Sequence, residues 1–264
     1  MSKSKSLRPE LDSVIDAAWQ RAKDIAGFLA EDEFRALGML AACAPGNGVI
    51  VEIGSFKGKS TLALAAVAAE YRLGAVVSID PHCSPSVTDP DFHGHSSSLE
   101  DFRANLRAAG LEHQVEVHPA FSGDVAKEWS RPIRMLWIDG DHTYKGAKQD
   151  FDLFSPYLVE GGIIALHDTL GKKFEGPIRV FVEDILRSDN FGPAGFSHSI
   201  GWSQYRPKDG TRFHAEREWL AQRAARLIPF VADGQEPKGL RQIRYKLCRW
   251  RVPHSELPAT ERLS

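Results

Sequence analysis

The residues that decide the fold are Val49-Ile-Val-Glu-Ile-Gly-Ser-Phe-Lys-Gly-Lys-Ser-Thr61. The first five, 49–53, are apolar, mostly β-branched and bounded by glycines, which predicts a buried strand. A turn containing Gly54 and Gly58 follows, and an alanine- and leucine-rich run then predicts a helix over residues 59–71. A strand, a glycine turn and a helix in this order form the arrangement that holds nucleotide-type cofactors in α/β proteins.

Strands and helices alternate on both sides of this segment. Two amphipathic helical pieces are expected within residues 8–43. Further strands are expected at 75–79, 114–118, 134–138 and 163–166, and further helices at 98–109, 145–158 and 177–186. This alternation predicts βαβ units, and therefore an α/β fold with a doubly wound, mainly parallel, Rossmann-like sheet that carries helices on both faces.

Composition and charge exclude several classes of protein. The chain has 264 residues, 42% hydrophobic and 26% charged, which is typical of a globular protein. Its formal net charge of −2 gives no electrostatic basis for binding nucleic acid, and none is expected. Three scattered cysteines argue against a disulfide scaffold and for a reducing compartment. Neither a membrane span nor a secretory signal is found, so we expect a cytoplasmic protein.

Three kinds of cofactor site compete for the glycine turn. A phosphate loop would need four residues between its glycines, but three separate Gly54 from Gly58. A dinucleotide turn would need a middle glycine where Phe56 stands. The remaining pattern, Glu52-x-Gly-x-x-x-Gly58 after a strand, resembles the first motif of the class I S-adenosylmethionine-dependent methyltransferases. The resemblance implies that the turn lies under the methionine part of the cofactor.

In that family an acidic residue ends the second strand and binds the ribose of the cofactor. Asp80 stands at this position, 26 residues after Gly54. A carboxylate can accept both hydrogen bonds of a ribose diol. The structural alternative for Asp80 is a strand-end cap or turn residue.

A second group of polar residues follows the fourth and fifth predicted strands. It lies in Ile138-Asp-Gly-Asp-His-Thr-Tyr144 and in Gly161-Gly-Ile-Ile-Ala-Leu-His-Asp-Thr169. Ligands of open α/β sheets bind beyond the carboxyl ends of the strands. Over residues 30–205, the two segments resemble the methyltransferases related to macrocin and sugar O-methyltransferases and to cephalosporin-pathway proteins. This resemblance implies about seven strands, the last of them antiparallel.

The resemblance also implies roles for these residues. Asp139, His167 and Asp168 would bind Mg²⁺, and Asp141 would be the general base. His167 stands where metal-dependent sugar methyltransferases tend to have aspartate, and imidazole favours Mn²⁺, Fe²⁺ or Zn²⁺, so the need for a metal stays open. His142 is an alternative base, because its ordinary pKa suits neutral pH. The structural alternatives are a helix cap for Asp139, a helix-start residue for His142 and a buried, packed histidine for His167.

Two other segments carry unusual residues. The loop after the second strand contains His82, Cys83, His93 and His95, whose spacing matches no common zinc site; covering the substrate is the other role considered. Residues 210–264 hold 11 Lys and Arg against 6 Asp and Glu. This basic segment is interpreted as a solvated helical face, with a dock for an acidic or phosphorylated partner as the alternative.

These observations predict an S-adenosylmethionine-dependent methyltransferase that acts on a hydroxyl of a small molecule or sugar, with Mg²⁺ or Mn²⁺ assistance left open. We expect a helical N-terminal segment (1–45), a cofactor-binding catalytic domain (46–208) and a basic, mainly helical extension (209–264). The residues expected to hold the cofactor are Glu52, Gly54, Ser55, Gly58, Asp80, Phe121, Ser122 and Asp139, where Phe121 and Ser122 border the adenine on the resemblance alone. The alternatives are a cofactor-binding regulatory or assembly protein without turnover, and a phosphate-loop nucleotide enzyme. A homo-oligomer is also left open.

Overall fold

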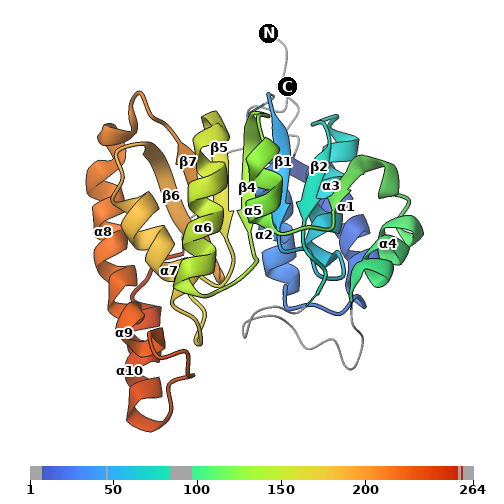
Figure 1. Ribbon diagram of the computed structural model, residues 1–264. Helices are drawn as coiled ribbons and strands as arrows, with labels where there is room; N and C mark the ends of the chain where they lie inside the picture. The colour runs from blue at the N-terminus through green and yellow to red at the C-terminus, as the bar shows by residue number, and fades with distance from the viewer. Residues whose placement is uncertain (1–7, 46, 84–96, 255–256, 258–264) are drawn as a thin grey trace.

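The computed structural model describes residues 8–45, 47–83, 97–254 and 257. A seven-stranded sheet with the order β3-β2-β1-β4-β5-β7-β6 crosses the molecule (Figure 1). Its strands are β1 Val49–Ile53, β2 Val76–Ile79, β3 Val115–His118, β4 Ile133–Ile138, β5 Leu158–Leu166, β6 Phe191–Ser197 and β7 Ile200–Tyr205. The pairs among β1 to β5 are parallel, and β7 runs antiparallel to both β5 and β6. The predicted doubly wound sheet with an antiparallel last strand is confirmed.

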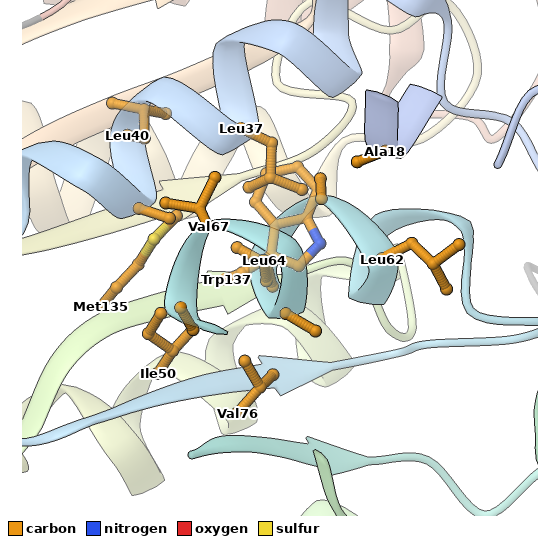
Figure 2. Packing of buried hydrophobic residues seen from close by; sticks show 14 of the residues in the cluster. Ala18, Leu37, Leu40, Ile50, Leu62, Leu64, Val67, Val76, Met135 and Trp137 are labelled. Carbon is orange, nitrogen blue, oxygen red and sulfur yellow. The ribbon is translucent and has the colours of Figure 1, made fainter. Parts of the chain in front are cut away.

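Helices cover both faces of the sheet because successive strand residues point to opposite sides. Ile50 and Met135 pack against one helical layer, whereas Val51 and Leu136 pack against the other. The first layer holds α1 Arg8–Ala22, α2 Glu31–Cys43, α3 Lys59–Glu70 and α4 Leu99–Ala108. The second holds α6 Tyr144–Phe154, α7 Gly176–Val180 and α8 His214–Ala224. Figure 2 shows the first layer from close by, with Leu37 and Leu64 beside the indole of Trp137.

One predicted boundary was wrong. The helix expected over 145–158 ends at Phe154, and a 3₁₀ turn that contains Pro156 leads into β5, which begins at Leu158. Proline lacks the backbone N–H that would continue the helix. The helix expected over 177–186 is confirmed, as the α-helix α7 over Gly176–Val180 that continues as a π-helix over Phe181–Leu186.

Four strands end at the same edge of the sheet. Ile53 of β1 is paired with Ile79 of β2 and with Ile138 of β4, and Ile138 is paired with Leu166 of β5. The residues that follow these strands are therefore neighbours, although they are far apart in the sequence.

The chain after β7 is helical, with α8, α9 Ile228–Val231 and α10 Gly239–Trp250. Within the described residues, no helix combines the length and the apolar character that a bilayer crossing requires. The division into segments at residues 45 and 208 stays a prediction.

Candidate active site

A cavity of about 750 Å³ lies over the carboxyl ends of β1, β2, β4 and β5. This volume falls in the range of roughly 300–1,000 Å³ that small-molecule sites occupy. The predicted residues that line it are Gly54, Ser55, Asp80, Phe121, Ser122, Asp139, Asp141, His142, His167 and Asp168. Two other predicted cofactor residues, Glu52 and Gly58, do not line it.

The glycine turn is shaped by positive backbone angles. Gly54 has φ 85°, and a Cβ there would lie 2.2 Å from the carbonyl oxygen of Asp139. Gly58 has φ 89° and precedes α3, and its N–H donates to the carbonyl of Ser55 at 2.7 Å. Gly54 therefore lets β1 and β4 approach each other at the cavity floor, and Gly58 completes the turn at the start of α3, outside the cavity lining.

Asp80 holds the turn in place. Its Oδ2 accepts hydrogen bonds from the N–H groups of Ser55 and Phe56, both at 2.8 Å, and its Oδ1 accepts one from His82 N–H at 2.6 Å. The last bond is an aspartate turn of the kind considered as the structural alternative. A carboxylate has about four acceptor positions, so the three bonds leave capacity for a ligand hydroxyl.

Glu52 lies behind the turn and not in the cavity. Its side chain is fully buried, and burial raises its pKa to about 8. The hydroxyl of Thr61 in α3 donates to Glu52 Oε2 at 2.5 Å. The structure thus shows Glu52 joining β1 to α3.

Four residues form what we call the acid–histidine cluster: Asp139 and His142 after β4, and His167 and Asp168 after β5. Asp139 Oδ1 lies 3.1 Å from His167 Nδ1 and 3.4 Å from His142 Nε2. Asp168 Oδ2 lies 3.5 Å from His142 Nε2 and 3.8 Å from His167 Nδ1. Each carboxylate therefore faces both imidazoles. Asp168 adopts φ 52°, a strained angle for a non-glycine residue.

The charges of the cluster support one another. Burial would raise the pKa of Asp139, but His167 and His142 outweigh it and lower that pKa to about 2. Burial would lower the pKa of each histidine, but Asp139 and Asp168 outweigh it, raising the pKa of His142 and bringing that of His167 well above its usual value. The carboxylates therefore favour the charged form of both imidazoles, and the imidazoles favour the ionised form of Asp139.

Glu33, at the start of α2, extends this network and was missed in the sequence. Its Oε2 lies 3.5 Å from His167 Nε2, and its Oε1 accepts from Ser199 N–H at 3.2 Å. Burial opposes its ionisation, yet His167, Ser199 and Ala30 lower its pKa to about 2. An acidic residue in the first turn of a predicted helix looks like a capping residue, and it is one here, since Ala30 N–H donates to it at 3.0 Å. No local signal marks its contact with His167, which is 134 residues away.

The two candidate bases differ in their surroundings. Asp141 Oδ1 accepts from Thr143 N–H at 2.8 Å and so shapes the entry into α6. The helix cap is Thr143, whose hydroxyl accepts from Gly146 N–H at 3.1 Å, so the cap alternative for Asp139 is wrong. His142 instead points its Nε2 at two carboxylates.

Asp150 forms a further wall of the cavity and was also missed. The hydroxyl of Ser122 donates to Asp150 Oδ1 at 2.6 Å, and burial raises the pKa of this carboxyl to about 7. Asp150 lies three residues after Ala147 and four before Phe154, on the inward face of α6. An aspartate on the apolar face of a predicted helix was therefore the signal available in the sequence.

The cluster has donor atoms suited to a metal. One atom each from Asp139, His142 and His167 lies within 4.8 Å of the others. This set contains His142 where the sequence predicted Asp168. Two imidazoles and a carboxylate fit Mn²⁺, Fe²⁺ or Zn²⁺ better than Mg²⁺. The contact of His167 Nε2 with Glu33 is the support that ligating histidines usually have on their second nitrogen.

The predicted histidine loop is only partly described. His82 is buried, and its Nδ1 lies 2.9 Å from Ser98 Oγ. Cys83 is exposed and lines the cavity. His93 and His95 lie outside the described residues.

Comparison with known proteins finds a family model and a curated relative that each match part of the chain. Residues 51–169, a little under half of the chain, match the model of a methyltransferase domain family. An uncharacterized protein, R132 of Acanthamoeba polyphaga mimivirus, is 28% identical over 125 residues, which are 45% of this chain and 50% of that protein. The chain thus spans about half the length of this curated relative.

Two solved structures share the fold. The O-methyltransferase NovP is 17% identical, with a TM-score of 0.56 over 75% of this chain and 99% of NovP. An O-methyltransferase from Bacillus cereus, solved in complex with SAH, is 20% identical, with a TM-score of 0.51 over 74% of this chain and 90% of that one. The family match and the fold confirm the resemblance drawn from the glycine turn and the two strand ends. Residues 51–169 therefore match a methyltransferase domain family, and the chain has the fold of these two O-methyltransferases.

Proposed function

We propose that this chain is an S-adenosylmethionine-dependent O-methyltransferase acting on a hydroxyl of a small molecule or sugar. The observation that carries the proposal is that the glycine turn and the acid–histidine cluster face one cavity. Transfer to a hydroxyl requires the acceptor oxygen to be held in line with the methyl group and its proton to be removed. The fold shared with NovP and the Bacillus cereus O-methyltransferase supports oxygen as the accepting atom.

The residues of the cavity fit the cofactor. The methionine part would lie against the Gly54 turn, and the ribose would use the remaining acceptor capacity of Asp80. Asp150, bonded to Ser122, would face the adenine amino group, because a carboxylate accepts from such a group. When bound, S-adenosylmethionine supplies an electrophilic methyl group. The SAH complex of the Bacillus cereus protein supports this cofactor.

We assign the general base to His142. Its neutral form would accept the hydroxyl proton, and because its Nε2 lies between Asp139 and Asp168, at 3.4 and 3.5 Å, the two carboxylates would stabilise the imidazolium that forms. His167, held between Asp139 and Glu33, keeps Asp139 ionised and in position. Asp141 is already bonded to the backbone of Thr143, and we assign it to the shape of the cavity wall.

A metal-assisted form of the same reaction is a second candidate, because three donor atoms of the cluster lie within 4.8 Å of one another. Asp139, His142 and His167 would hold the cation, with Asp168 beside them. A divalent cation, when bound, supplies a positive charge that orients acceptor oxygens and acidifies a hydroxyl. The cation would compete with protons for the two imidazoles, so its affinity would fall as the pH is lowered.

Calorimetric titration with S-adenosylhomocysteine, with ATP as the comparison ligand, tests the cofactor. Micromolar binding of S-adenosylhomocysteine without binding of ATP supports the proposal, and binding of ATP alone would overturn it. A screen of hydroxyl acceptors then compares the wild type with Asp139→Asn and with Asp152→Asn, an exposed carboxylate on α6. We expect Asp139→Asn to lose methyl transfer about 100-fold or more and Asp152→Asn to keep it.

The same assay distinguishes the metal-free reaction, the metal-assisted reaction and a regulatory protein without turnover. Activity that a chelator abolishes and Mn²⁺ restores assigns the metal-assisted form, whereas activity indifferent to the chelator assigns the metal-free form. A protein that binds S-adenosylhomocysteine but methylates no acceptor in the screen would instead favour a regulatory or assembly role.

A further inference from the structure

Helix α10 exposes an apolar face that points away from the rest of the molecule. Leu240, Ile243, Leu247 and Trp250 follow one another at spacings of three and four residues and share one side of the helix. They are 80, 55, 55 and 82% exposed, respectively. Tyr245, on the opposite side of the helix, is buried in the core. The exposed apolar face is therefore turned outward and is not an edge of the core.

The residues around this face are basic. Residues 238–251 contain six Lys and Arg and no Asp or Glu. Arg241 pairs with Asp233 at 2.6 Å, and Arg249 donates to the carbonyl of His198 at 2.7 Å, so these two serve the fold. Arg244 and Lys246 flank the apolar face on its two sides, are exposed and have no acidic partner among the described residues.

We propose that α10 docks on an anionic lipid surface, with its apolar face inserted and its flanking cations at the headgroups. A helix with Leu, Ile and Trp on one side and Lys and Arg beside them is the pattern of helices that lie in the membrane interface. Tryptophan is enriched at that level of a bilayer. The surface charge that complements Arg244 and Lys246 is negative, which selects anionic lipids.

The same charges disfavour a second copy of the chain as the occupant. Symmetric pairing through this face would bring together two segments that carry six cations each and no anion. Like charges in contact oppose such an interface.

Helix α10 adjoins the proposed active site through the side opposite its apolar face. The hydroxyl of Tyr245 donates to the carbonyls of Leu170 and Gly171, at 2.9 and 2.8 Å. Gly171 lines the cavity, as does Glu236 in the connection before α10. Figure 1 shows α10 at the end of the molecule to which the carboxyl ends of the parallel strands point. If the proposed function holds, the enzyme would work next to a lipid surface, but lipid docking is tested without any turnover.

Vesicle sedimentation of the full chain tests the proposal. We expect binding to vesicles of phosphatidylcholine with phosphatidylglycerol, about tenfold weaker binding to phosphatidylcholine alone, and a steep loss with added salt. Leu247→Gln with Trp250→Gln, and separately Arg244→Gln with Lys246→Gln, should each weaken binding about tenfold or more. Trp219→Gln removes an exposed aromatic ring on α8 and should leave vesicle binding unchanged.

The outcomes separate the occupants of the face. Binding of S-adenosylhomocysteine by all variants shows that they are folded and that the proposed function is unaffected. Absence of binding to anionic vesicles overturns the proposal. The proposal is also overturned if sedimentation velocity shows a dimer of the wild type that dissociates in the variant Leu247→Gln with Trp250→Gln, because the apolar face would then bind a second copy of the chain.

Discussion

Glu52→Gln tests how the cofactor turn is supported. Glu52 is fully buried, and its pKa is raised from 4.5 to about 8. Between these two pH values, the Glu52 carboxyl is therefore protonated in the folded protein and ionised in the unfolded chain. Glutamine cannot titrate, and it fills the same space.

The sign and size follow from this difference. Because the pKa of Glu52 is raised in the folded protein, the contribution of this carboxyl to stability is fully present below pH 4.5 and is lost as the pH rises through about 8. Each pH unit in this window costs the wild type about 1.4 kcal/mol relative to the variant. The free energy of unfolding of the wild type, minus that of Glu52→Gln, should fall by roughly 4 kcal/mol between about pH 5 and pH 8.

Urea unfolding of both proteins at these two pH values measures the difference, and Glu70→Gln, an exposed carboxylate at the end of α3, is the control. A difference that does not change with pH would show that Glu52 is ionised in the folded protein and would refute the reasoning. Because Glu52 does not line the cavity, Glu52→Gln should bind S-adenosylhomocysteine within about threefold of the wild type near pH 5. A large loss of affinity in a stable variant would restore the direct cofactor contact predicted from the sequence.

Three further substitutions have expected results. Gly54→Ala places a Cβ 2.2 Å from the carbonyl oxygen of Asp139 at φ 85°, so thermal unfolding should show a loss of about 2 kcal/mol or more; an unchanged melting temperature would contradict the close approach. The affinity of the wild type for S-adenosylhomocysteine should increase as the pH rises through about 7, the pKa of the Asp150 carboxyl, because the ionised carboxylate is the better hydrogen-bond acceptor. Asp150→Asn should remove this pH dependence. If the affinity changes with pH equally in both proteins, Asp150 does not contact the adenine. Glu33→Gln should lower the pKa of His167 by removing a carboxylate 3.5 Å from its Nε2, as an NMR titration of the metal-free protein would show, and an unchanged pKa would mean that the pair does not form.

The strands and their polar ends were predictable because their signals are local. The β-branched run 49–53 and the glycines after it identify β1 and its turn within a few residues. Once the strands are known to be parallel, Asp139 and His167 must meet, since residues after neighbouring strands share one edge. The early end of α6 was missed because Pro156 lies inside an otherwise helical apolar pattern.

The sequence by itself determined the class of sheet, the resemblance to methyltransferases and the two strand ends that line the cavity, because periodicity and turn residues act over short distances. The tertiary structure alone decided that Glu33 supports His167 from 134 residues away, that Asp150 faces the cavity with Ser122, and that Glu52 lies behind the turn. A carboxylate has the same local pattern whether it faces water, a ligand or the core. Its pKa and its role are set by the charges and the burial that distant segments bring to it.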